Sequence, residues 1–186
     1  MQFVVWLYVL LGLIGLLIIY AIFTYNRLVR LRVRCENAWS QIDVQLRRRY
    51  DLIPNLIQSV KGYAAHEREV FEDVTQARSQ AQAASGVQAQ ADAENEVTRS
   101  LNRLLAVAEN YPDLKASQNF LALQEELTGT ESKIAFARQF YNDQVQSLNT
   151  LIGTFPSRIV AAAGRFQRRD FFEIEEPTRG PVSVQF

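Results

Sequence analysis

Histidine and cysteine, common ligands of transition metals in proteins, are scarce in this sequence. His66 is the only histidine and Cys35 the only cysteine, so a site built on a pair of either cannot form within one chain. His66-Glu67 resembles the start of a zinc-binding HExxH helix, but Val70 stands where the second histidine would be. A di-metal carboxylate centre needs two Glu-x-x-His pairs, and Tyr63 stands three residues before His66. We therefore expect no metal and no cofactor.

Nucleophilic and acid–base chemistry find little support either. Cys35 falls on an apolar stripe, which is typical of a small buried side chain rather than of a nucleophile. Glu125, Glu126 and Glu131 could pair as catalytic carboxylates, but the charged face of any long helix has the same composition. The phosphate-binding, dinucleotide-binding and GxSxG motifs are all missing from the sequence. The sequence predicts a protein that is not an enzyme.

Composition limits the fold and the partners. A chain of 186 residues allows one ordinary domain, and only 8 glycines and 5 prolines argue against an all-β or loop-rich fold. The 20 basic residues balance the 20 acidic ones, whereas a nucleic-acid-binding domain is expected to be basic. We expect an all-α protein that binds no nucleic acid.

An uncharged run near the N-terminus predicts a transmembrane anchor over residues 1–26. Phe3 to Phe23 contains 21 residues without a charge, and at ~1.5 Å per residue they span about the thickness of a bilayer core. A cleaved signal peptide would have a basic start and a shorter apolar stretch. Trp6 and Tyr25 lie near the two ends, as interfacial aromatic residues do.

Arginines that follow this run predict its orientation. Arg27, Arg30, Arg32 and Arg34 come directly after it, and only the amino terminus is basic before it. The positive-inside rule then places the N-terminus outside and the rest of the chain in the cytoplasm. The four arginines could also contact lipid headgroups of the bilayer, or they could serve only as a stop-transfer flank.

Apolar residues beyond the anchor recur every three or four positions, which predicts long helices over residues 27–154. We expect about four helices in an antiparallel up-and-down bundle. Pro54 leaves two alternatives, because an interior proline either kinks a helix or ends it. A reversal near Arg49–Asp51 would let the last helix cover the stripe on residues 28–46, whereas a kink would leave one long stalk. The need to bury that stripe favours the reversal.

Two basic segments could mediate contacts. Arg47 to Asp51 could dock an acidic partner or could be a solvated helix end. Residues 155–172 form a short basic and apolar segment, followed by an extended or mobile tail over residues 173–186. If the chain reverses near Pro54, the antiparallel helices return this segment to the membrane. It would then make a second membrane contact, with these contacting residues: Phe155, Ile159, Arg165 and Phe166. The alternative is that the segment caps the helical bundle.

Several sequence blocks resemble the LemA family of bacterial membrane proteins. The blocks are YNRLV (25–29), ENAWSQIDVQL (36–46), RRYDLIPNL (48–56), KGYAAHE (61–67), YPDLKA (111–116), TESKIAFAR (130–138), YN (141–142) and FPS (155–157). The resemblance extends from the anchor to about Phe172. It implies a single span of the bacterial inner membrane near the N-terminus, an outward-facing N-terminus and a helical bundle, and it brings no catalytic residues.

The resemblance also suggests a class of function. Some LemA relatives are associated with membrane shaping in magnetosome formation, and others are encoded beside membrane proteases. We expect a membrane-anchored scaffold that forms homo-oligomers and organises membrane or protein partners. The alternative is a monomeric adaptor or quality-control partner of a membrane protease. Within the family blocks, the residues expected to form a shared structural or interaction motif are Arg48, Arg49, Asp51, Pro54 and Asn55.

Overall fold

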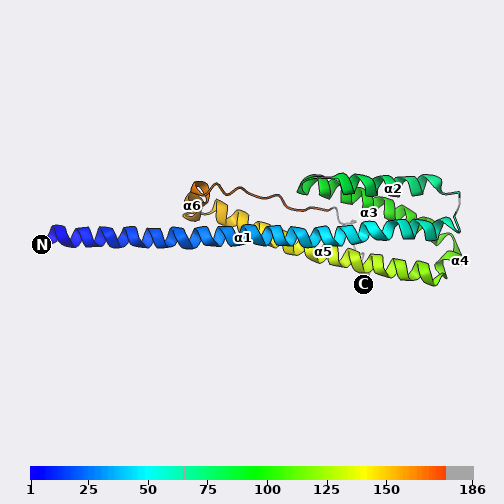
Figure 1. Ribbon diagram of the computed structural model, residues 1–186, viewed down its shortest axis with the longest axis horizontal. Coiled ribbons are helices and arrows are strands. Elements are labelled where there is room, and N and C mark those ends of the chain that lie inside the picture. The colour runs from blue at the N-terminus through cyan, green and yellow to red at the C-terminus, as the bar shows by residue number, and fades with distance from the viewer. Residues whose placement is uncertain (65, 175–186) are drawn as a thin grey trace, which may run out of the picture. The chain divides into compact units, whose positions relative to one another are not determined.

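Six α-helices make up the described part of the chain, residues 1–64 and 66–174 of a computed structural model (Figure 1). They are α1 (Gln2–Lys61), α2 (Arg68–Ala83), α3 (Val87–Glu109), α4 (Pro112–Lys115), α5 (Gln118–Gly153) and α6 (Ser157–Ala163). No strand occurs among these residues, which confirms the predicted all-α fold class. Most of the predicted tail, residues 175–186, lies outside the described residues.

The N-terminal part of α1 is the one candidate membrane span in the described chain. It is long and apolar enough to cross a bilayer, and none of its most apolar window is buried inside the protein. Trp6 and Tyr25 near its ends are exposed. Such a bare apolar surface is unfavourable in water and favourable in lipid. By length and composition, α1 therefore fits the predicted anchor.

α1 continues through Pro54, so the predicted reversal near Arg49–Asp51 is wrong. The helix is 60 residues long and ends at Lys61, and the next helix, α2, begins at Arg68. Because proline has no N–H, the carbonyl of Tyr50, four residues earlier, loses its helical donor. Arg78 of α2 replaces that donor: its Nε donates to the Tyr50 carbonyl at 2.8 Å. A side chain from the next helix thus makes the proline compatible with an unbroken helix.

The chain divides into two compact units, and the two longest helices contribute to both. The first unit contains residues 1–41 and 137–170. Its core combines the predicted stripe of α1 with the C-terminal half of α5, and Trp39 packs on Tyr141 with ring centroids 5.4 Å apart. Cys35 is fully buried there, as predicted, and burial raises the pKa of its thiol. The buried side chains of this core include Leu28, Leu31, Cys35, Ala38, Tyr141, Val145 and Leu148.

The second unit contains residues 42–136 and, among the described residues, 171–174. α2 and α3 pack against each other as a helical hairpin whose turn includes Gly86 at φ 91°. Ala81 and Ala91, on either side of this turn, are buried, and their small side chains let the two helices approach closely.

Candidate functional site

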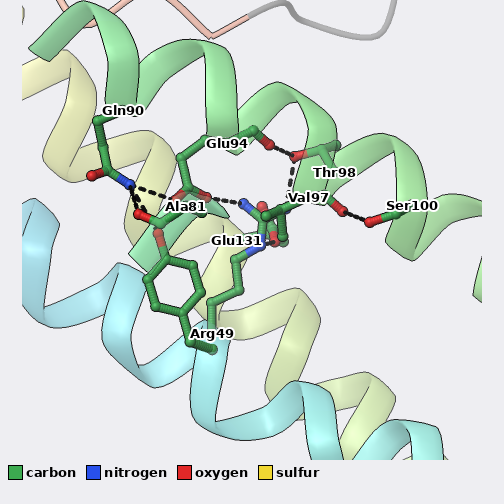
Figure 2. A network of polar contacts seen from close by, with 9 residues as sticks. Arg49, Ala81, Gln90, Glu94, Val97, Thr98, Ser100 and Glu131 are labelled. Carbon is green, nitrogen blue, oxygen red and sulfur yellow. Dashed lines mark hydrogen bonds and ion pairs between the residues drawn. The ribbon is translucent and has the colours of Figure 1, made fainter. Parts of the chain in front are cut away.

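A buried arginine joins three helices of the second unit. Arg49 of α1 is 1% exposed, and its Nη1 lies 3.1 Å from Glu94 Oε2 of α3. Its Nε lies 2.9 Å from Glu131 Oε1 of α5, and its Nη2 donates to Thr98 Oγ1 at 2.7 Å (Figure 2). An arginine presents its donors in a rigid planar fork, which suits it to several acceptors at once. One side chain therefore links α1, α3 and α5.

Tyr50 and Gln90 complete the same cluster. The Tyr50 hydroxyl donates to the Glu94 carboxylate, and Gln90 Nε2 lies 2.9 Å from the Tyr50 hydroxyl and 3.0 Å from Glu94 Oε1. Gln90 Nε2 also lies 3.1 Å from the carbonyl of Ala81 in α2. We call this cluster the Arg49 network, and its members are Arg49, Tyr50, Gln90, Glu94, Thr98 and Glu131.

Helical spacing explains how α3 contributes three of these side chains. Gln90, Glu94 and Thr98 are four residues apart, so they lie on one face of the helix. Glu94 has no exposed surface, and a buried charge is tolerated only when it is paired and hydrogen-bonded. Arg49, Tyr50 and Gln90 together meet that requirement.

The Arg49 network places two carboxyl groups against one guanidinium. Burial raises the pKa of Glu94, and Arg49 opposes that effect. Burial also raises the pKa of Glu131, again against Arg49. The pKa of Tyr50 is raised by burial and by the neighbouring Glu94, so its hydroxyl remains a donor. Chemically, the cluster can hold a proton and can clamp helices together.

The structure separates the residues of the predicted interaction motif. Arg49 is buried, so its proposed docking to an acidic partner or headgroups is wrong. Arg48 points outward and forms an exposed 2.7 Å ion pair with Glu126 of α5. Asp51, Pro54 and Asn55 are exposed on α1. The motif is thus partly a core clamp and partly surface.

The other sequence candidates do not assemble into a site. His66 is exposed in the turn after α1, and Glu125 and Glu126 are exposed on α5. Within residues 1–64 and 66–174, no three His, Cys, Asp or Glu side chains lie close enough together to hold a metal ion.

The family model described as the LemA family matches residues 38–186, which is most of the chain. The chain belongs to the LemA family. The match includes every member of the Arg49 network, and it begins after the uncharged run of residues 3–23.

Curated relatives support this membership. Magnetosome protein MamQ 2 of Paramagnetospirillum magneticum is 24% identical over 179 residues, covering 82% of this chain and 65% of the relative. Protein LemA of Metamycoplasma hominis is 28% identical over 153 residues, covering 80% of this chain and 66% of the relative. Magnetosome protein MamQ of Magnetospirillum gryphiswaldense is 23% identical over 179 residues, with shares of 82% and 65%. The chain spans just under two thirds of the length of these relatives.

Membership and the apolar N-terminal helix together indicate a membrane-associated helical protein. The arginines expected to contact headgroups, Arg27, Arg30, Arg32 and Arg34, are exposed on α1 after the span. Phe155 and Ile159 of the predicted second contact are 79% and 60% exposed.

The end of the predicted second contact packs differently from its start. Phe166 is half-buried, with its ring 5.6 Å from that of Tyr25. Arg165 is exposed. The segment of residues 155–169 therefore lies against the start of the arginine-rich part of α1. We expected a reversal of the chain near Pro54 to bring it there, but α1 continues to Lys61.

Sequence reasoning missed Gln90, Glu94 and Thr98. The available signal was that Glu94 continues the apolar stripe of Val97 and Leu101 at a spacing of three and four. A charged residue on an apolar stripe needs a buried partner, and Arg49 interrupts the stripe of α1 between Leu46 and Ile53 in the same way.

Proposed function

We propose that this LemA family chain is a single-pass, non-enzymatic scaffold of the bacterial inner membrane that self-associates through its helical domain. In this proposal the N-terminus faces outward and the helical domain faces the cytoplasm, because the arginines cluster after the span. The similarity to relatives named as magnetosome proteins supports a role in organising a membrane. The scaffold would gather membrane or protein partners around its copies.

One observation carries the self-association: an uncovered face on the N-terminal half of α5. Phe136 and Leu121 are exposed at 74% and 49% on this face. A Cβ on the neighbouring Gly129 would meet nothing within 4 Å, so the side of α5 is open there. We call this surface the α5 face, and it comprises Leu121, Glu125, Thr128, Ser132 and Phe136, spaced by three or four residues.

The α5 face suits a helix of another copy. Its centre has short side chains, Thr128 and Ser132, between two large apolar ones, which permits close helix approach with apolar anchors at each end. Large apolar side chains left in water are unfavourable, so covering Phe136 and Leu121 would favour association. A second copy supplies the same surface in return, as a two-fold interface requires.

Light scattering of the full chain in detergent tests this proposal. We expect a discrete oligomer for the wild-type protein and a monomer for Leu121→Ser/Phe136→Ser. Val44→Ser is the matched control, because Val44 is 60% exposed on α1 and lies outside the α5 face. A wild-type monomer would overturn the scaffold, and a monomer that co-purifies with a membrane protease would favour the adaptor instead. Equal dissociation in the control would exclude the α5 face as the contact.

A further inference from the structure

A basic cavity lies in the first unit, between α1 and the segment after α6. Its volume is about 260 Å³, and four arginines line it together with the apolar side chains of Leu148 and Phe166. We call it the arginine cavity, and its arginines are Arg32, Arg165, Arg168 and Arg169.

Positive charge in this cavity exceeds the local negative charge. Glu36 pairs with Arg169 at 2.7 Å. Among the described residues, no carboxylate forms an ion pair with Arg32, Arg165 or Arg168. Guanidinium groups gathered without counter-charges favour an anion, and their planar donors suit the oxygens of a phosphate.

Contacts to both long helices hold the segment that forms the cavity. Asn149 of α5 fixes the backbone of Arg169 from both sides: its Nδ2 donates to the Arg169 carbonyl at 2.8 Å, and its Oδ1 accepts from the Arg169 N–H at 3.0 Å. The Tyr141 hydroxyl donates to the carbonyl of Asp170 at 3.0 Å. Arg32 lies over the ring of Phe166, 5.6 Å from its centroid. The cavity is therefore preformed, which lowers the entropy lost on binding.

The position of the cavity along α1 points to lipid. The ring of Phe166 packs on Tyr25, which follows the last residue of the apolar run, Phe23, by two residues, or ~3 Å of helix. The polar headgroup layer is roughly 5–8 Å thick on each side of a bilayer core. If α1 spans the membrane, Arg165 and Phe166 lie close to that layer.

Apolar residues on the same segment strengthen the choice of a lipid over a free anion. Phe155, just before α6, and Ile159, within α6, are 79% and 60% exposed. α6 ends next to Tyr25, because a Cβ on Gly164 would lie 3.2 Å from the ring of Tyr25. A free phosphate would make no contact with such apolar side chains, whereas the boundary between headgroups and acyl chains accommodates them.

We propose that the arginine cavity binds the phosphate of an anionic phospholipid of the membrane that α1 spans, with Phe155 and Ile159 inserting at the boundary of the acyl chains. This inference rests on the membrane anchoring in the proposed function, and it is independent of self-association. It makes residues 155–169 a second attachment of the helical domain to the bilayer.

Native mass spectrometry of the full chain in neutral detergent tests the proposal with short-chain phosphatidylglycerol and phosphatidylcholine as probes. We expect one bound phosphatidylglycerol and weaker binding of phosphatidylcholine. Arg165→Asn/Arg168→Gln should weaken phosphatidylglycerol binding roughly thirtyfold, from about fivefold per arginine. Asparagine is chosen at position 165 because the backbone there has φ 54°, which asparagine tolerates.

A matched control removes the same charge from outside the cavity. Arg47→Gln/Arg68→Gln changes two exposed arginines that do not line the cavity and that the membrane contacts do not include. Because salt screens exposed charges outside the site, this variant should weaken binding by no more than about twofold. An equal loss in both double variants, or equal binding of the two lipids, would overturn the site. Displacement of the lipid by inorganic phosphate at equal concentration would overturn its assignment to lipid.

Two further measurements distinguish a specific loss of lipid binding from unfolding and from loss of self-association. Circular dichroism checks that each variant folds, and Phe155→Ser/Ile159→Ser, which leaves every arginine in place, should lower phosphatidylglycerol binding without unfolding. Unchanged binding in that variant would refute the apolar insertion. Light scattering of the same samples reports self-association separately, so loss of the lipid site and failure of the scaffold give different results.

Discussion

Replacing Arg49 by methionine should destabilise the helical domain far more than the same change at its neighbour Arg48. Arg49 is 1% exposed and its partner Glu94 has no exposed surface, so the substitution leaves a carboxylate buried without its cation. Removing one partner of a buried ion pair costs about 3–5 kcal/mol. Methionine keeps an apolar stem of similar length, so most of the cost should be electrostatic.

Arg48→Met is a close control on the same helix. Its ion pair with Glu126 has the short distance of 2.7 Å, but the two side chains are 47% and 43% exposed. Water screens such a pair, and its loss costs about 0.2–1 kcal/mol. The two variants thus remove the same charge from adjacent positions in different surroundings.

Urea unfolding of the full chain in detergent, followed by far-UV circular dichroism, measures both variants. The free energy of unfolding should fall by about 3–5 kcal/mol for Arg49→Met and by at most about 1 kcal/mol for Arg48→Met. Adding Glu94→Gln to Arg49→Met should recover part of the loss, because glutamine carries no charge. Equal costs for the two arginines, or no recovery in the double variant, would refute the assignment of Arg49 as a core clamp.

Three more predictions follow from other contacts. Folding raises the pKa values of Glu94 and Glu131, so between the ordinary carboxyl pKa of 4.5 and the raised values the folded chain binds more protons than the unfolded chain. The melting temperature should therefore fall as the pH rises through that window. Glu131→Gln should make this dependence on pH weaker, and a stronger dependence would contradict the prediction. Arg78→Met should lower the free energy of unfolding in urea by about 1–3 kcal/mol, because it leaves the Tyr50 carbonyl without a donor. The loss should be smaller when Pro54→Ala is also present, because residue 54 then regains its N–H. Equal losses with and without Pro54→Ala would exclude the carbonyl as the cause. A reporter active only in the cytoplasm should be active when fused after Phe186, whereas activity of a periplasm-only reporter there would reverse the proposed orientation.

Periodicity predicted the helical core well. The stripe that begins at Leu28 and continues through Cys35 and Ile42 is buried as expected, and the last long helix ends at Gly153, one residue before the end of the predicted helical region. Spacing on one helix determines which residues share a face, so burial can be inferred from it without knowledge of the partner helix.

Features that depend on a partner helix could not be predicted in this way. The continuity of α1 at Pro54 depends on Arg78, and these residues are 24 positions apart, so no local pattern connects them. The burial of Ala81 and Ala91 depends on how closely α2 and α3 approach. Arg49 and Glu94 each interrupted an apolar stripe, but only the packed helices show that the two interruptions face each other.

Pro54 also acts as a marker of register between α1 and α2. In an unbroken helix every interior carbonyl is already occupied by the N–H four residues later, and the proline leaves the carbonyl of Tyr50 available instead. Arg78 donates to this carbonyl, so sliding α2 by one turn would separate the two groups and leave both without this partner. The missing hydrogen bond in α1 thus favours one register of α2 over the registers shifted by a turn. Matching apolar surfaces alone would permit several registers.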